Sequence, residues 1–242
     1  MATYVISDLH SHLEILQRFM KDVKEDDRIY CLGDTIDKGP DGIKVLQYVM
    51  RHPQITLLMG NHELMMLEFL EADHKLSEVY FVDELYLSQC EKERQITGNQ
   101  WLMWNWGDFT YSDYLKLDQQ ERDEIYDYLK TLPVMLNVQV NNREFLLVHA
   151  MPYEDNGIKD LYYGDVEADI EQYVWMRNPY CHVENKTVIV GHDIVQIEFR
   201  KKTIETDGQW YDIDLGLAMN NELSRLAVLC LDDLSVKYYD LT

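Results

Sequence analysis

Five short blocks of carboxylate, imidazole and amide side chains recur along the sequence, each directly after a short apolar run. The blocks contain Asp8 and His10, Asp34 and Asp37, Asn61 and His62, His149, and His192. Taken singly, each has an ordinary structural explanation, because buried polar side chains are usually satisfied by hydrogen bonds. Five such blocks at five candidate strand ends are hard to ascribe to chance. Oxygen and imidazole ligands without thiolate suit Mn²⁺, Fe or Zn²⁺, so the sequence predicts a metal site.

The apolar runs before these blocks predict the strands that must position them. Runs at 2–7, 29–32 and 55–59 alternate with helical patterns, which indicates parallel strands joined by right-handed crossovers. The polar blocks then lie on strand-to-helix loops at one edge of a sheet, where open α/β folds bind their ligands. Ser11 is expected to be the N-cap of the first helix.

The second half of the sequence is rich in strand patterns. A hairpin is predicted from 134–140 and 144–148, with its turn at Asn141-Asn142. The fully apolar run at 187–190 is another strand, and 169–177 is a short helical candidate. A mostly antiparallel set is expected to be completed by runs at 194–200, 210–214, 223–231 and 236–241.

Between these halves, the segment at about 71–131 interrupts the rhythm with acidic and aromatic residues. No linker separates two domains, so we expect one domain over residues 1–242, with this segment as a helical and aromatic insertion. The insertion could cap a pocket, or it could form a satellite hydrophobic cluster under a long loop. The sequence leaves both interpretations open.

The composition argues against several classes of protein. Lys and Arg number 22 against 44 Asp and Glu, and this net charge of −22 disfavours binding to nucleic acid or to an anionic membrane. The four cysteines form no Cys-x-x-Cys pair, which argues against zinc knuckles and a disulfide framework. No run reaches transmembrane length and the N-terminus enters a strand at once, so a cytoplasmic location is expected. Neither a P-loop nor a Gly-x-Ser-x-Gly elbow is present.

The order of the five blocks resembles that of a known family. The motifs are Asp-x-His at 8–10, Gly-Asp-x-x-Asp-x-Gly at 33–39, Gly-Asn-His-Glu at 60–63, His-Ala at 149–150 and Gly-His at 191–192. They are similar to those of the calcineurin-like metallophosphoesterases, and most of all to the PPP-type phosphoprotein phosphatases and their bacterial and phage relatives. The resemblance runs from Asp8 to about Gly216. It implies an α/β fold, a four-layer sandwich of two mixed sheets flanked by helices.

The resemblance also implies a role for each block. A first divalent cation would be held by Asp8, His10 and Asp34, and a second by Asp34, Asn61, His149 and His192. Manganese is the expected metal, with iron or zinc as alternatives. Two such cations roughly 3.5–4 Å apart generate a bridging hydroxide that attacks phosphorus. His62 would be the general acid, oriented by Asp37, because a nearby carboxylate favours the charged imidazole.

The expected phosphate clamp departs from the family pattern. Lys38 stands where the phosphatases have arginine, and Met59 stands where arginine is frequent. A lysine offers a point charge where arginine offers a bidentate fork, so phosphate affinity or substrate type can differ. Arg177 lies in a segment that resembles the Trp-x-Arg segment of the phage and bacterial enzymes, and it is the second candidate. A structural ion pair is the alternative role for Arg177.

Three functional hypotheses follow. The leading one is a di-metal phosphoesterase that hydrolyses phosphomonoesters, foremost phosphoserine and phosphothreonine in proteins. The second is hydrolysis of dinucleoside polyphosphates or of other small phosphoanhydrides or phosphodiesters, which the weakened arginine complement leaves open. The third is a metal-binding scaffold without catalysis, against which the intact set of ligands and acid argues. The native metal and the oligomeric state do not follow from the sequence.

Overall fold

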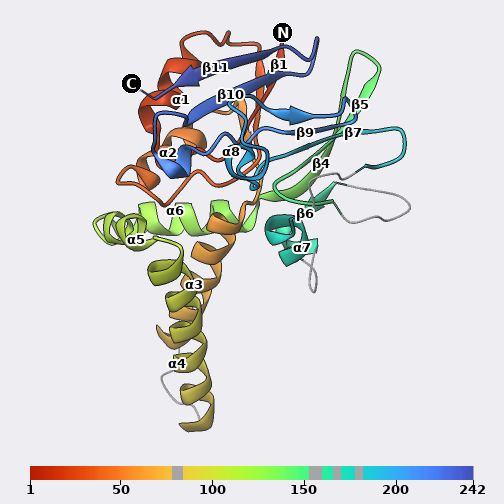
Figure 1. Cartoon of the computed structure of the whole chain (residues 1–242). Helices are drawn as coiled ribbons and strands as arrows, with labels where there is room; N and C mark the ends of the chain where they lie inside the picture. The colour runs from red at the N-terminus through yellow and green to blue at the C-terminus, as the bar shows by residue number, and fades with distance from the viewer. Residues whose placement is uncertain (78–83, 153–159, 166–169, 178–181, 242) are drawn as a thin grey trace.

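The computed structural model describes residues 1–77, 84–152, 160–165, 170–177 and 182–241. Two sheets lie at its centre (Figure 1). The first has the order β11-β10-β1-β2-β3, in which β1, β2 and β3 are parallel and β10 is antiparallel to both of its neighbours. Its strands are β1 Thr3–Ile6, β2 Arg28–Cys31, β3 Ile55–Leu57, β10 Arg225–Cys230 and β11 Val236–Asp240.

The second sheet has the order β6-β4-β5-β7-β9-β8. Its strands are β4 Pro133–Val140, β5 Arg143–Val148, β6 Leu161–Tyr162, β7 Thr187–Val190, β8 Glu205–Thr206 and β9 Trp210–Asp212. The predicted hairpin turn is confirmed, because Asn141 and Asn142 both have positive φ (49° and 63°), as a two-residue hairpin of this type requires.

The expectation of a mostly antiparallel second half is wrong for the middle of this sheet. β5, β7 and β9 are parallel to one another, although β4, β6 and β8 are antiparallel to their neighbours. The long connections at 149–186 and 191–209 let the chain cross back, so each of these strands starts from the same end of the sheet. β7 is accordingly apolar and almost wholly buried along its length, as a central parallel strand should be.

Helical elements fill the connections. They are α1 Leu13–Met20, α2 Gly42–Arg51, α3 Asn61–Ser77, α4 Glu84–Gly98, the π-helical segment η1 Asn99–Trp104, α5 Asp108–Tyr114, α6 Gln119–Lys130, the short turn η2 Tyr163–Asp165, α7 Ile170–Trp175, α8 Val195–Glu198 and the short turn η3 Leu217–Met219. Among the described residues, no helix combines the length and the apolar character that crossing a bilayer would require.

The strand predicted at 194–200 is wrong, because this segment contains the helix α8. The amide of Phe199 bonds the carbonyl of Val195, 2.9 Å away, and Val195 is fully buried. The apolar residues of the segment fit an alternating pattern and a helical one equally well, since Val195 and Phe199 are also one helical turn apart. The bond from the amide of Val195 to the carbonyl of Asp214 ties the start of the helix to the end of β9.

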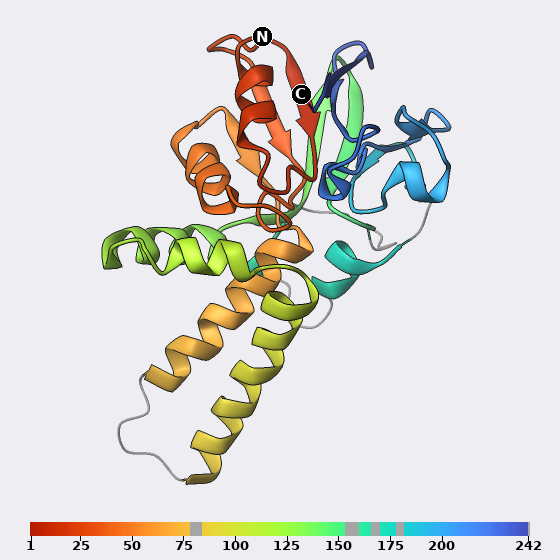
Figure 2. The same ribbon diagram turned by 60° about the vertical axis from the view of Figure 1, so that its left-hand side comes forward.

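Successive side chains along the strands point into two different hydrophobic layers. Val5 and Leu147 belong to a core between the two sheets, whereas their neighbours Ile6 and Leu146 belong to the core that includes the helices. In Figures 1 and 2, α1 and α2 cover the outer side of the first sheet, and α7 packs on β4 of the second. The predicted four-layer arrangement of two mixed sheets flanked by helices is confirmed.

A helical arm stands away from the sheets. α3 and α4 pack side by side and project from the body in both views, while α5 and α6 lie across the base of the arm (Figures 1 and 2). The first helix of the arm, α3, begins at Asn61. Treating the chain as one domain with an insertion remains a prediction.

Candidate active site

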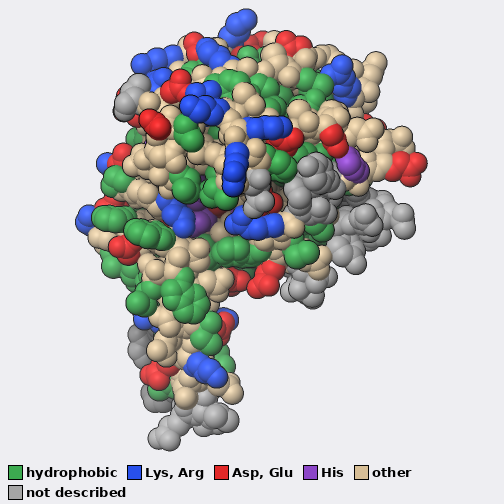
Figure 3. Space-filling view, in the orientation of Figure 1, with side chains coloured by type: hydrophobic (Ala, Val, Ile, Leu, Met, Phe, Trp, Pro, Cys, Tyr) green, Lys and Arg blue, Asp and Glu red, His purple; other side chains and the backbone are tan. Residues whose placement is uncertain are grey.

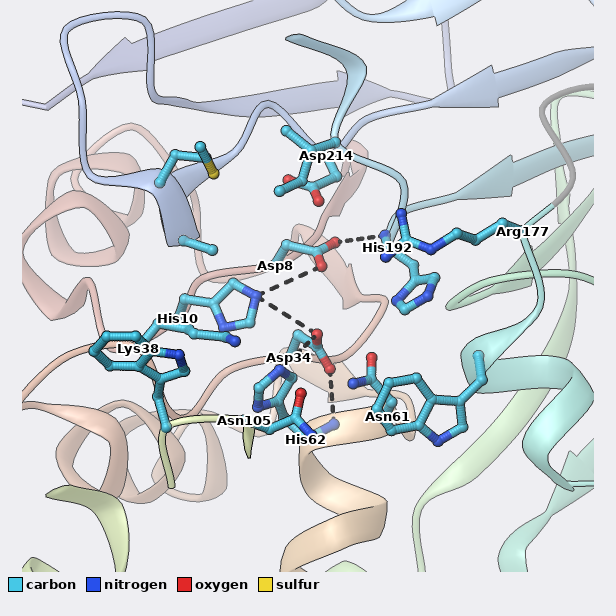
Figure 4. A pocket seen from close by; sticks show the side chains of 15 residues that line it. Asp8, His10, Asp34, Lys38, Asn61, His62, Asn105, Arg177, His192 and Asp214 are labelled. Carbon is cyan, nitrogen blue, oxygen red and sulfur yellow. Dashed lines mark hydrogen bonds and ion pairs between the residues drawn. The ribbon is translucent and has the colours of Figure 1, made fainter. Parts of the chain in front are cut away.

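The five blocks predicted from the sequence meet where parallel strands of both sheets end. Asp8 follows β1, Asp34 follows β2 and Asn61 opens α3 just after β3. From the second sheet, His149 follows β5 and His192 follows β7. The strand ends therefore bring together side chains separated by up to 184 positions, as the bond from the amide of His192 to Asp8 illustrates (Figure 4).

Asp34 lies between two groups of potential metal ligands. Its Oδ2 is 3.5 Å from Nε2 of His10, and its Oδ1 is 3.5 Å from Nε2 of His149. On the first side, Oδ1 of Asp8 is 3.9 Å from Nε2 of His10. On the second side, Oδ1 of Asn61 is 3.1 Å from the same nitrogen of His149. Ligand atoms of Asp34, His149 and His192 all lie within 4.8 Å of one another.

Backbone carbonyls set the orientation of two of the imidazoles. Nδ1 of His10 lies 3.1 Å from the carbonyl of Ile36, and Nδ1 of His149 lies 2.9 Å from the carbonyl of Leu32. A carbonyl can only accept, so each Nδ1 carries the proton and each Nε2 presents a lone pair to the centre. This is the usual arrangement of metal-ligating histidines. Nε2 of His192 has no hydrogen-bond partner among the described residues, although the side chain is buried.

Several of these residues have a strained backbone. Asp8, Asp34 and His192 have φ of 52°, 55° and 67°, a backbone region that residues other than glycine seldom adopt. Such conformations cluster at functional sites because the surrounding structure holds them. Gly60 has no room for a side chain, since a Cβ would run into the Asp34 carboxylate.

The predicted N-cap at Ser11 is wrong: His12 is the N-cap residue of α1, and the Ser11 hydroxyl donates to the carbonyl of Asp37 instead.

Glu63 connects two loops of the site, the loop after β2 and the loop before α3, by hydrogen bonds. Its Oε2 accepts from the amides of Asp34 (2.7 Å) and Gly60 (3.2 Å), and its Oε1 accepts from the amide and hydroxyl of Thr35 (both 2.7 Å). Glu63 is fully buried. Its carboxylate thus connects the loop after β2 to the start of α3, a supporting role rather than a place at the metal centre.

The buried carboxylates of the site would be stabilised in their charged form by positive charge close to them. Burial, with a contribution from the Asp214 carboxylate, raises the pKa of Asp8 well above its usual range, and burial with Asp8 does the same to the pKa of Asp34. Burial holds the pKa values of His10 and His149 well below their usual range, so both are neutral and able to coordinate. Buried carboxylates beside neutral imidazoles and an unpartnered nitrogen fit a pair of divalent cations.

His62 and Asp37 form a buried pair at the edge of this centre. Nδ1 of His62 lies 2.6 Å from Oδ2 of Asp37. Nε2 of His62 lies 3.8 Å from Oδ2 of Asp34, and both of these residues are labelled in Figure 4. Burial raises the pKa of Asp37 to about 7, although hydrogen bonds from Thr110 and Trp101 oppose this shift. Burial and Lys38 hold the pKa of His62 well below its usual range. The expected favouring of the imidazolium by Asp37 remains a prediction.

With this geometry in view, comparison with known proteins decides the family. The family model for calcineurin-like phosphoesterases matches residues 1–211. The chain belongs to the calcineurin-like phosphoesterase family. The predicted family is thereby confirmed.

Individual relatives differ in what they are named for. The chain is 24% identical over 178 residues to serine/threonine-protein phosphatase 2 of Salmonella typhimurium, a match that covers 72% of this chain and 67% of that protein. It is 38% identical over 72 residues to a symmetrical bis(5'-nucleosyl)-tetraphosphatase of Pseudomonas putida, covering 28% and 25% of the two chains. A serine/threonine phosphatase structure from Saccharomyces cerevisiae shares the fold, with a TM-score of 0.57, 10% identity, and coverage of 100% and 80%.

A cavity of about 440 Å³ opens onto the centre of this calcineurin-like site. Lys38 and Arg177 both line it, as the sequence predicts, and Figure 3 shows Lys and Arg side chains around the hollow on this face. Lys38 is half-buried, whereas Arg177 is exposed and pairs with Asp193 at 2.9 Å. The ion pair considered for Arg177 is thus present. A role in binding phosphate remains a prediction for both residues.

Sequence reasoning missed several residues of the site. Asn105 and Trp106 of the aromatic segment line the cavity, and Trp101 bonds to Asp37. The aromatic composition of this segment indicated that it could cover a pocket, but nothing in the sequence indicated which strand ends its residues would face. Asp214 also lines the cavity and is buried. The rule that polar residues follow apolar strands finds Asp214 once β9 is known to end at Asp212.

Proposed function

We propose that the chain is a metal-dependent phosphatase that hydrolyses phosphomonoesters, with phosphoserine and phosphothreonine residues of proteins as its substrate class. One observation carries this proposal. Each oxygen of the Asp34 carboxylate faces a different imidazole, and the His62–Asp37 pair stands beside the same carboxylate. A site for two cations and a proton donor therefore share one cavity, which is the requirement for hydrolysing a phosphoester without a covalent intermediate.

Two divalent cations are proposed at this centre, with Mn²⁺ the first to test. Asp8, His10 and Asp34 would hold one, and Asp34, Asn61, His149 and His192 the other. When bound, such cations supply a nucleophile from water at neutral pH and offset charge on the phosphoryl oxygens. Asp34 presents one oxygen to each group of ligands and would therefore contribute to holding both cations.

His62 is proposed to protonate the leaving oxygen. Its Nδ1 is occupied by Asp37, which leaves Nε2 to face the centre and to give its proton to the departing alkoxide. Burial disfavours the imidazolium in the isolated protein, but a phosphate dianion in the cavity adds negative charge close by and raises the pKa of His62. Substrate binding thus prepares the acid that the reaction consumes.

Lys38 and Arg177 are proposed to bind the phosphoryl oxygens. The protein as a whole carries a net charge of −22, yet two cationic side chains line this cavity. The carboxylates of Asp8, Asp34 and Asp214 line the same cavity, so Lys38 and Arg177 would attract an anion together with the bound cations. Because the ion pair with Asp193 partly neutralises the charge of Arg177, Lys38 is expected to provide the larger part of the attraction for the phosphoryl group.

A second candidate is hydrolysis of a dinucleoside polyphosphate. It is supported by the match to a symmetrical bis(5'-nucleosyl)-tetraphosphatase and by lysine in place of the phosphatase arginine at position 38. The same cations and the same acid would serve. Two indoles, those of Trp106 and Trp175, line the cavity and offer flat apolar surface to a base.

The deciding experiment compares substrates on one metal-loaded preparation. Hydrolysis of p-nitrophenyl phosphate that depends on added Mn²⁺ tests the phosphatase, and a phosphoserine peptide set against diadenosine tetraphosphate separates the two candidates by kcat/KM. Asp34→Asn with His62→Ala is the inactive control. Full activity in that double variant, or stoichiometric metal binding with no turnover of any phosphoester, would overturn the proposal. The second outcome would favour a metal-binding scaffold.

A further inference from the structure

One side chain of the aromatic segment reaches the proposed proton donor through Asp37. Trp101 lies in η1, is fully buried, and its indole N–H donates to Oδ2 of Asp37 at 2.8 Å. The same oxygen lies 2.6 Å from Nδ1 of His62. Trp101, Asp37 and His62 therefore form a continuous line of hydrogen bonds that ends at Nε2 of His62, on the side of the cavity.

Few other contacts fix the Asp37 carboxylate. Its Oδ1 has no hydrogen-bond partner within the described part of the chain, whereas Oδ2 is bonded to both His62 and Trp101. The amide of Asp37 is bound separately, by the hydroxyl of Thr110 at 3.1 Å. Thr110 positions the backbone of the loop, and its side chain also lowers the pKa of the Asp37 carboxyl. The nitrogen groups that bond Oδ2 of Asp37, among the described residues, are those of Trp101 and His62.

Trp101 is itself held firmly. Its ring contacts those of Phe69 and Tyr111, with centroids 5.5 Å and 5.9 Å apart. Gly107 lies against the indole so closely that a Cβ there would collide with Nε1. A ring packed on several sides cannot follow a rotating carboxylate, so the position of the N–H group is fixed by this packing against α3 and α5 and not by Asp37.

We propose that Trp101 is a positioning residue, whose indole N–H fixes the Asp37 carboxylate and through it the orientation of His62 towards the leaving oxygen. This inference rests on the proposed function, because His62 is the proton donor only in that reaction. It gives the aromatic segment a second task besides lining the cavity. Without the indole N–H, Asp37 can rotate, and His62 loses the alignment that proton transfer needs.

The test is Trp101→Phe, which keeps an aromatic ring and removes the N–H donor. A phosphoester with a poor leaving group needs the proton most, so kcat on phenyl phosphate should fall roughly tenfold, a fraction of what a general acid contributes. On p-nitrophenyl phosphate, whose leaving group is a much weaker base, kcat should fall about twofold or less. Trp210→Phe is the matched control, because Trp210 is also a buried tryptophan and lies in β9. It should leave the ratio of the two rates unchanged.

A readout without turnover separates this inference from the proposed function. The proton between Nδ1 of His62 and Asp37 should give a downfield proton NMR signal that disappears in His62→Ala. In Trp101→Phe that signal should move or broaden, and in Trp210→Phe it should stay in place. Equal loss of rate on both substrates, or an unchanged signal, would show that Trp101 only supports the fold. Failure of the wild-type protein to hydrolyse either substrate would instead overturn the proposed function.

Discussion

Asn61 and His62 are neighbours in the first turn of α3, yet their side chains have different partners. Asn61 faces His149 on the second group of ligands, whereas Nδ1 of His62 faces Asp37. Successive residues of a helix point about 100° apart, since 3.6 residues make one turn, so one helix start can supply both a ligand and a proton donor. The distinction can be tested, because ligand atoms of His62, His10 and Asp34 also lie within 4.8 Å of one another.

Replacing His62 by asparagine should remove the acid and keep the cations. We expect kcat to fall by about 10²-fold or more, the usual contribution of a general acid, with unchanged stoichiometry of bound Mn²⁺. Kinetics on phenyl phosphate and metal analysis of the dialysed protein measure the two quantities. Asp34→Asn serves for comparison and should lose both metal and activity. Loss of metal from His62→Asn would identify His62 as a ligand and contradict its proposed role.

Glu63 supports the site through hydrogen bonds, so its removal should cost stability. Glu63→Gln replaces one carboxylate oxygen with an NH₂ group, which then faces backbone N–H donors of Asp34 and Gly60 or those of Thr35. We expect the free energy of unfolding to fall by about 3 kcal/mol, the cost of leaving buried donors unsatisfied. Urea denaturation at a fixed Mn²⁺ concentration measures it.

The matched control for that variant is Glu121→Gln. Glu121 also accepts a backbone N–H, that of Asp118 at 3.2 Å, but it does so at the exposed start of α6. Glutamine serves as well as glutamate in such a capping box, so the change should be a few tenths of a kcal/mol. Similar losses in the two variants would mean that the bonds of Glu63 are worth no more than a surface cap.

At the scale of the element, α3 runs from the site into the arm and carries a half-buried acid, Glu68. Burial raises the pKa of Glu68 to about 7 from its usual 4.5, and the nearby carboxylates of Glu171 and Glu71 add to this shift. A raised pKa in the folded state favours the protonated form, so its stabilising contribution is complete below about pH 4.5. The contribution is lost as the pH rises through about 7.

Glu68→Gln should remove this pH dependence. At pH 8 we expect the variant to be more stable than the wild type by about 1 kcal/mol, a value reduced for the partial exposure of the side chain. At pH 4.5 the two proteins should unfold with nearly the same free energy. Thermal unfolding of both proteins from pH 4.5 to pH 8 gives the comparison. A constant difference across this range would show that Glu68 does not titrate with folding.

Helices and strands were predictable from the sequence where a local pattern fits only one type of secondary structure. The strand at 187–190 and the hairpin turn at Asn141-Asn142 follow from local rules, and both are present. The helix α8 differs from the predicted strand because Val195 and Phe199 suit either period, and the bond from the amide of Phe199 to the carbonyl of Val195 decides for the helix. The parallel order of β5, β7 and β9 depends on crossovers that alternation within a strand does not reveal.

At the scale of the whole molecule, the candidate metal centre was predictable and its surroundings were not. The proposed ligands share one local signal, a polar residue just after an apolar strand, and parallel strands bring such residues to one edge. The contact of Trp101 with Asp37 spans 64 positions and joins η1 to the loop after β2. No spacing rule connects two elements that meet only through the packing of the arm, so this contact required the folded structure.

Because the proposed ligands come from both sheets, metal binding should raise the free energy of unfolding of the whole protein. Asp8, Asp34 and Asp214 bring like charges together in a buried place, and bound cations would offset their repulsion in the folded state alone. Mn²⁺ at about 100 times its dissociation constant should stabilise the protein by about 2.7 kcal/mol per site. The unfolding midpoint should therefore rise as Mn²⁺ is titrated into protein stripped with a chelator.

Two variants show whether that gain comes from the proposed centre. Asp34→Asn weakens both groups of ligands at once and should abolish most of the rise in unfolding temperature. Glu124→Gln removes a carboxylate from the exposed face of α6, where it accepts a hydrogen bond from Gln120, and should leave the rise intact. An equal rise in both variants would mean that Mn²⁺ binds the acidic surface in general. In that case the two groups of ligands around Asp34 would not be the site that holds the cations, and Asp34 would be one buried acid among several.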